Sequence, residues 1–387
     1  MRLTVRAAVG RVGGAEVTIL VASAIGSVGV MWFPSQLGAS AGAGAEFALV
    51  VNTLALAAAV AGTVTLAHRH PGRRFLALVG EVVSPAVAPL AGLLTAALDV
   101  ALAAVVLVAS SVTMASAFLP LTPIWAVQLL LLAPAAYGAG LGLEAMARTL
   151  DVAGPITAAV LVATCLFTLS QAHFGPAIFG GVPAIGGWGA ILSGAYASAW
   201  ALGGVTLVPN VCAQIAPEQR PRLRGGVVLG AAVATVMSFG LLVIDLAVLG
   251  VTGLSWYEWP TVSMLRQTRT EAFLINRVGG LDEWVFVVMA WAFVGLHLWN
   301  AAVNVTDLLA RGDRSERGPA MPLRNAALLG ALVLAVYAVS RAFGQGAALA
   351  GFSSGYLSPA VVAIGVALPC ALVAVDAARR RLGGRKA

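Results

Sequence analysis

The chain has 387 residues, of which 60% are hydrophobic and 10% are charged, and its mean hydropathy is +0.93. A soluble domain usually carries about 25% charged residues, so this composition excludes an ordinary soluble protein. The net charge of +7 comes from basic residues spread over several places without aromatic interleaving. We therefore expect contact with the anionic lipid of a bilayer and no nucleic-acid partner.

Ten apolar stretches are long enough to cross a bilayer, which takes roughly 20 mostly apolar residues. We predict an all-α integral membrane protein with ten transmembrane helices. No polar stretch is long enough for a soluble domain, so residues 1–387 form a single polytopic membrane domain. The predicted spans 1 to 10 cover residues 14–36, 45–67, 84–114, 121–143, 155–172, 187–212, 225–252, 280–309, 321–342 and 355–377.

The basic residues fall in alternate gaps between these spans. Of the 23 Lys and Arg residues, 19 lie in one set of connections and four in the other, namely Arg266, Arg269, Arg277 and Arg341. Cytoplasmic loops carry an excess of Lys and Arg, so we predict that both termini are cytoplasmic. The basic residues of the cytoplasmic set are Arg2, Arg6, Arg11, Arg69, Arg73, Arg74, Arg148, Arg220, Arg222, Arg224, Arg311, Arg314, Arg317, Arg324, Arg379, Arg380, Arg381, Arg385 and Lys386.

Span 1 contains the segment Gly26-Ser27-Val28-Gly29, followed by Pro34. Two glycines three residues apart and a proline weaken a helix near the middle of the bilayer. The sequence therefore predicts an interruption of span 1.

Span 6 has a matching interruption five spans later, at Leu202-Gly203-Gly204 and Thr206, with Pro209 beyond. Interrupted helices at corresponding places in two halves indicate a transporter-type binding site. There, freed amides and helix N-termini point at an anionic group such as a carboxylate. The alternative is that the glycines only allow close packing of helices.

Span 8 carries a stripe of polar residues on one helical face. His297, Asn300, Asn304 and Asp307 recur at i, i+3, i+7 and i+10, a spacing typical of one side of a helix. The stripe could line an inner water pathway or contact the interrupted span 1. It could also hold the bundle together by hydrogen bonds between helices.

Asp99 in span 3 and Asp245 in span 7 are isolated carboxylates within apolar segments. An ionisable residue inside the membrane is a candidate proton or cation site. The alternative, which we favour here, is a protonated carboxyl group bonded to a neighbouring helix, since neither residue has an obvious basic partner in the sequence.

Motifs of metal sites and of soluble enzymes are absent from the sequence. Cys165, Cys212 and Cys370 lie in or beside different spans without metal-ligand spacing. There is no Walker loop, His-Glu-x-x-His motif or nucleophile elbow. We therefore expect no metal, no cofactor and no enzymatic activity.

Several segments, in order along the chain, resemble the endospore germination permease family, the B subunit of spore germinant receptors. Span 1 with Gly26, Gly29 and Pro34 is similar to the family's opening helix. Other similar positions are Thr122, Pro123, Trp125, Tyr137, Gly142, Glu144, Ala147 and Arg148 across span 4, and Pro260, Arg277 and Trp291 around the connection into span 8.

This family belongs to the amino acid–polyamine–organocation transporter superfamily. The resemblance implies a five-plus-five inverted repeat of the leucine-transporter type, with spans 1 and 6 unwound around a central small-molecule site. It also implies residence in the spore inner membrane, assembly with an A and a C subunit, and a nutrient ligand that is usually an amino acid.

Two functions remain open. The first is a receptor subunit that binds a nutrient and signals to its partner subunits. The second is an amino acid permease coupled to protons or cations. Fold alone does not decide between them.

Overall fold

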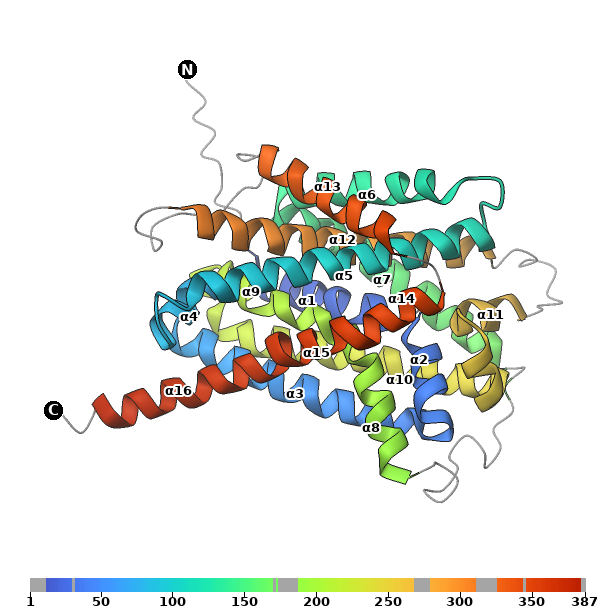
Figure 1. The fold of residues 1–387 in the computed structure, drawn as a ribbon, viewed down its shortest axis with the longest axis horizontal. Coiled ribbons are helices and arrows are strands. Elements are labelled where there is room, and N and C mark those ends of the chain that lie inside the picture. Colours follow the sequence, from blue (N-terminus) through green and yellow to red (C-terminus); the bar gives the residue numbers. More distant parts are fainter. Residues whose placement is uncertain are drawn as a thin grey trace.

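The computed structural model describes residues 12–29, 32–169, 172, 187–267, 279–310, 326–343 and 346–383, and almost all of these residues are helical. Figure 1 shows a bundle in which the long helices run roughly along one common direction. Seven predicted spans each correspond to one helix. These helices are α3 (Ala45–Arg69), α5 (Ala88–Ala117), α6 (Ile124–Leu141), α7 (Leu143–Thr168), α10 (Leu223–Trp256), α12 (Gly279–Leu309) and α13 (Ala326–Ala342).

The described residues contain eight helical segments that are long and apolar enough to cross a membrane. Two shorter apolar helices, α1 (Gly14–Gly29) and α13, lie at predicted spans 1 and 9. The prediction of an all-helical membrane protein is confirmed, whereas the count of ten spans stays a prediction.

Both predicted interruptions are present in the fold. Span 1 consists of two helices, α1 and α2 (Phe33–Ala41). Trp32, just before α2, is a turn residue, and Val30 and Met31 lie outside the described residues. Span 6 consists of α8 (Gly187–Ser198), the 3₁₀ segment η4 (Ala199–Leu207) and α9 (Val208–Ala213). A 3₁₀ run of nine residues is unusually long, since such runs rarely exceed three or four residues.

The last span is helical throughout but contains two π-helical stretches. It comprises α14 (Ala347–Phe352), η7 (Ser353–Leu357), α15 (Ser358–Val361), η8 (Val362–Ala367) and α16 (Leu368–Gly383). π-helical bulges occur frequently at functional sites. In this chain Ser353 and Ser358, at the starts of η7 and α15, are fully buried.

Helix α7 differs from its predicted boundary, and some short helical segments were not predicted. Helix α7 begins at Leu143, well before predicted span 5, so the expected loop after span 4 is helical. Gly142, with φ of +97°, joins α6 to α7 in a conformation that favours glycine, and Glu144 and Arg148 pair at 2.5 Å on the first turns of α7. Short helices that the sequence pattern did not reveal are α4 (Phe75–Val82) and α11 (Pro260–Gln267), with 3₁₀ segments η1 (Gly42–Gly44) and η5 (Pro217–Arg222).

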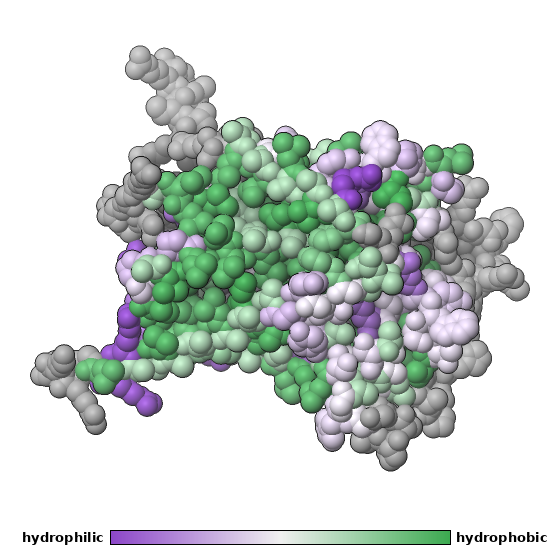
Figure 2. Space-filling model, in the orientation of Figure 1, coloured by the Kyte–Doolittle hydropathy of each residue, from purple (hydrophilic) through white to green (hydrophobic). Residues whose placement is uncertain are grey.

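The outer surface is apolar, as expected for a protein surrounded by lipid. Leu54, Leu130, Leu166, Val236 and Leu334 are each more than 60% exposed. Figure 2 shows apolar residues across much of this face, with hydrophilic residues toward both ends of the bundle, including the end where α4 and α16 lie. Together with the apolar helices, this surface indicates an integral membrane protein.

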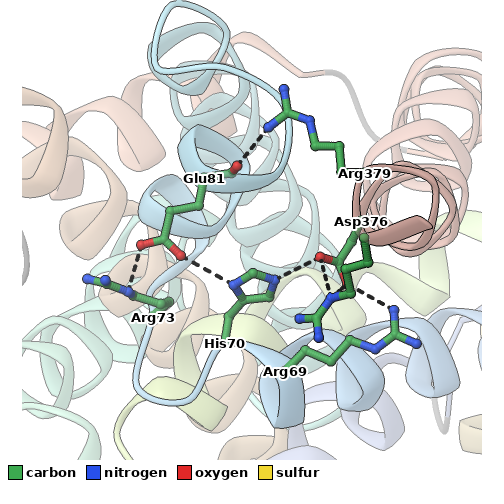
Figure 3. A network of polar contacts seen from close by, with 7 residues as sticks. Arg69, His70, Arg73, Glu81, Asp376 and Arg379 are labelled. Carbon is green, nitrogen blue, oxygen red and sulfur yellow. Dashed lines mark hydrogen bonds and ion pairs between the residues drawn. The ribbon is translucent and has the colours of Figure 1, made fainter. Parts of the chain in front are cut away.

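Ion pairs tie three helix ends together at that hydrophilic end (Figure 3). His70, just after α3, contacts Glu81 of α4 through Nδ1 and Asp376 of α16 through Nε2, each at 3.3 Å. Arg69 donates to Asp376 at 2.9 Å, and Arg73 pairs with Glu81 at 2.7 Å. The ends of α3, α4 and α16 are therefore held in one polar network.

Candidate ligand-binding site

The two interrupted spans cross in direct backbone contact at Gly204. A Cβ atom at this position would lie 2.1 Å from the carbonyl oxygen of Ala24 in α1 and 2.8 Å from the amide nitrogen of Ile25. These atoms belong to backbone and cannot move aside as a flexible side chain could. Glycine at 204 is therefore required for α1 to cross η4.

The other predicted glycines have different surroundings. A Cβ atom at Gly203 would lie 2.6 Å from Leu102 of α5, whereas one at Gly26 would meet Ala234 of α10 at an ordinary 3.5 Å. Gly29 is the last residue of α1. Close packing therefore explains Gly203 and Gly204, and it does not explain Gly26.

Ser27, Val28 and Leu202 complete the predicted set around the interruptions. The hydroxyl of Ser27 is bonded back to the carbonyl of Ser23 within α1. The side chain of Val28 lies outside the described part of the structure. Leu202 lines a small cavity beside η4.

This cavity lies between the interrupted spans and their neighbours and has a volume of about 30 Å³. Binding pockets for small ligands usually measure about 300–1,000 Å³, whereas this cavity has room for about one water molecule. Its walls come from α1, α2, α3, α8, η4 and α10. The lining residues are Ile25, Phe33, Leu49, Asn52, Thr53, Leu56, Ser198, Ala201, Leu202, Ala234, Thr235 and Ser238.

Polar side chains from span 10 and from the second half of span 1 form hydrogen bonds beside the η4 interruption. The Trp200 indole donates to Gln36 Oε1 at 2.6 Å, and Gln36 donates to Ser353 at 2.8 Å. The Ser358 hydroxyl accepts from the Trp200 amide at 3.1 Å. Trp200 also packs edge-on against Trp32 of the span 1 interruption, with ring centroids 5.3 Å apart. Side chains from span 1 and span 10 therefore contact Trp200 of the η4 interruption or one another directly.

A fully buried polar cluster lies on the other side of η4. Asp99 of α5 is bonded through Oδ1 to His297 Nδ1 and through Oδ2 to Asn300 Nδ2 of α12, each at 2.8 Å. The Thr206 hydroxyl lies 3.3 Å from the same Oδ1 and 2.8 Å from the carbonyl oxygen of Gly203. The carboxyl group of Asp99 thus has three partners and links spans 3, 6 and 8.

The cluster continues along the polar stripe of α12 to α4. The Asn210 amide of α9 donates to Asn300 Oδ1 at 2.8 Å and to Asn304 Oδ1 at 3.2 Å. Asn210 Oδ1 accepts the backbone N–H of Phe75, the first residue of α4, at 2.9 Å. A chain of hydrogen bonds therefore runs from Asp99 to the start of α4.

Asp307, the last member of the stripe, pairs with Arg74 at 2.8 Å just before α4. Hydrogen bonds and ion pairs between helices therefore account for all four stripe residues. His297 Nε2 and Asn304 Nδ2 are buried and have no hydrogen-bond partner in the described part of the chain.

Asp245 lies apart from this cluster. It accepts a hydrogen bond of 2.8 Å from Thr261 of α11 and is fully buried. This arrangement resembles the structural alternative considered for both carboxylates, a carboxyl group bonded to a neighbouring helix. Asp99 has a partner that the sequence did not reveal, because His297 lies 198 residues away in sequence but adjacent in space.

The site contains residues that the sequence analysis missed. Asn210, Gln36, Trp200, Asn52 and the pair Ser353 and Ser358 all contribute buried polar contacts beside the interruptions. An available signal was a polar side chain inside an apolar span, which identifies Asn52 and Asn210.

No group of three His, Cys, Asp or Glu side chains that could hold a metal occurs among the residues described.

Comparison with known proteins identifies the family. The sequence model for the family described as spore germination protein matches residues 11–337. The chain belongs to this family. No protein with a curated description matches it in sequence.

Solved structures of transporters share the fold of this spore germination protein. MhsT in complex with L-phenylalanine is 13% identical, with a TM-score of 0.65, over 93% of this chain and 88% of MhsT. A Na⁺-coupled sialic acid symporter in a substrate-bound outward-open state is 11% identical, with a TM-score of 0.59, over 92% of this chain and 79% of the symporter. The predicted family and the leucine-transporter-like fold are confirmed.

Proposed function

We propose that this chain is the transporter-like subunit of a spore germinant receptor. It binds a small nutrient, preferably an amino acid, and signals to A and C partner subunits in the spore inner membrane. The observation that carries the proposal is the crossing of two interrupted spans at Gly204, beside a small cavity. In this fold, interrupted helices of this kind form small-molecule sites.

The ligand site in this proposal is framed by Gly26, Ser27, Val28 and Gly29 on one side, with His297 and Asn300 nearby. Leu202, Gly203, Gly204 and Thr206 frame the other side. Amides at the start of α2 and in η4 would meet a carboxylate. The related fold of MhsT, which was solved with L-phenylalanine, supports an amino acid as ligand.

The hydrogen-bond chain from Asp99 to α4 supports a signalling role. A ligand at Thr206 would act on Asp99, and Asn300 and Asn210 connect Asp99 to the Phe75 amide. Helix α4 lies at the end rich in arginine, where a partner subunit could detect its position. A receptor needs such a connection, whereas a permease needs only a path for its substrate.

The second candidate function is an amino acid permease coupled to protons or cations. The buried Asp99–His297 pair favours it, because a carboxylate and an imidazole at 2.8 Å can share and exchange one proton. His297 Nε2 has no hydrogen-bond partner among the described residues, so this nitrogen is available to the pair for a further proton contact.

Spores that lack this chain, complemented with wild-type or variant genes, test the receptor function. We expect lost germination with one nutrient class, restored by the wild-type gene. Gly29→Leu and Asp99→Asn should abolish the response while the protein stays in the membrane. Asp151→Asn, at an exposed carboxylate of α7, is the matched control and should respond normally. A normal dose–response in Gly29→Leu would contradict the proposed site.

Uptake measurements on the purified chain in proteoliposomes separate the two candidates. Uptake of a labelled amino acid that rises with an imposed pH gradient, and is lost in His297→Gln, would favour the permease. Saturable binding without uptake would favour the receptor. An unchanged response to every nutrient in spores that lack the chain would remove the receptor proposal.

A further inference from the structure

A groove on the outside of the bundle lies between α3 and α10, next to the cavity described above. It has a volume of about 670 Å³, within the usual range for ligand pockets. Its residues come from these two helices alone. They are Thr53, Leu56, Ala57, Val60, Ala61, Val64, Thr65, His68, Arg69, Arg224, Val228, Ala231, Ala232, Thr235 and Val236.

Small alanine side chains create the hollow in an apolar wall. Ala57 and Ala61 on α3 and Ala232 on α10 are exposed along it, and Val228 and Val236 flank them. An exposed apolar channel of this size on a membrane-facing pair of helices fits an extended hydrocarbon chain. A polar nutrient would leave its hydrogen-bonding groups unpaired there.

One end of the groove is basic. His68 and Arg69 lie in the last turn of α3, and Arg224 lies in the first turn of α10. Arg224 is exposed and has no ion pair in the described part of the chain. Asp376 pairs with Arg69 and is shared with Arg380, so the charge left uncompensated at this end is that of Arg224. The groove therefore joins an apolar channel to uncompensated positive charge.

We propose that this groove binds an anionic phospholipid. The phosphate of the head group contacts Arg224 together with Arg69 and His68, and one acyl chain lies along the exposed alanines. Basic pockets between transmembrane helices on the cytoplasmic side recognise anionic head groups in this way. The end of the groove that carries these residues is the arginine-rich end of the bundle, where the inner leaflet is predicted to lie.

The lipid would contact a wall of the small cavity beside η4. Thr53, Leu56 and Thr235 line both the groove and the small cavity beside η4. An acyl chain in the groove would therefore stiffen the same three side chains that close the cavity.

Native mass spectrometry of the full-length purified chain tests the proposal with phosphatidylglycerol as the probe. We expect saturable binding of one phosphatidylglycerol and no comparable binding of phosphatidylcholine. Arg224→Gln should weaken binding about fivefold, since one basic residue near an anionic surface contributes about 1 kcal/mol. Arg148→Gln removes the same charge from an exposed site outside the groove and should leave binding unchanged.

A second variant tests the apolar channel. Ala61→Leu with Ala232→Leu fills the hollow at exposed positions without changing charge, and it should weaken phosphatidylglycerol binding while thermal stability is retained. Inorganic phosphate and glycerol phosphate should compete poorly. Equal binding of phosphatidylcholine, unchanged binding in Arg224→Gln, or unchanged binding in the filled variant would each overturn the proposal.

Discussion

At the scale of single residues, the crossing of the two interrupted spans depends on Gly204. The backbone of α1 occupies the space that a side chain would need, as the 2.1 Å approach to the Ala24 carbonyl oxygen demonstrates. A flexible side chain at this place could rotate away from an added Cβ atom. A backbone carbonyl of a packed helix cannot move without shifting the helix. The chemistry at the site therefore depends on a position that contributes no side chain.

Gly204→Ala should destabilise the protein by about 1–3 kcal/mol or more, the range typical of overpacking. The measurement is thermal unfolding of the purified protein in detergent. Gly225→Ala is the matched control, because Gly225 is exposed on α10 and a Cβ atom there meets nothing within 4 Å. An alanine at 204 that leaves the melting temperature unchanged would contradict the packing described.

The sequence predicted part of the site at this scale. Gly203, Gly204 and the stripe on span 8 were recognisable because glycine pairs and polar residues stand out in apolar segments. The Asp99–His297 pair was not, because their contact depends on how α5 packs against α12 and no local spacing reveals it. The serines of span 10 were missed for the same reason, since Ser358 bonds to Trp200 across 158 residues of sequence and Ser353 bonds to Gln36 across 317.

At the scale of helices, Asn210 connects α9, α12 and α4. Its side chain both donates to the α12 stripe and accepts the first amide of α4. Glycine and proline content was sufficient to predict both interruptions, because it acts on the backbone directly. Helices α4 and α11 were missed because each is only eight residues long, shorter than a reliable periodic pattern.

Asn210→Leu should release the start of α4. The Phe75 amide would be left buried without an acceptor, which costs about 1–3 kcal/mol. Hydrogen exchange should become faster in residues 75–82. Asn52→Leu removes another buried asparagine, bonded to Ser198 and not to α4, and should leave α4 exchange unchanged. Equal protection of α4 in both variants would argue against this connection.

At the scale of the whole molecule, the apolar surface and the arginine distribution predict how the protein lies in the bilayer. Because charge and hydropathy are summed over many residues, these features survive local errors in span boundaries. The early start of α7 is such an error, and it leaves the predicted sidedness unchanged.

Cysteine labelling checks the predicted orientation. In a background without Cys165, Cys212 and Cys370, Arg381→Cys should react with an impermeant maleimide only after the membrane is opened. Gly189→Cys, at the exposed start of α8 where a Cβ atom has space, should react from outside. Labelling of position 381 in intact cells would reverse the assignment.

The small volume of the cavity beside η4 has a consequence for sensitivity to nutrients. A space of about 30 Å³ admits no amino acid, so a ligand can enter only when the helices have separated. The concentration that half-saturates the protein then equals the intrinsic dissociation constant divided by the fraction of open molecules. Two related chains with identical contacts to the nutrient could therefore respond at very different concentrations, and the dose threshold would be tuned by residues that never touch the ligand.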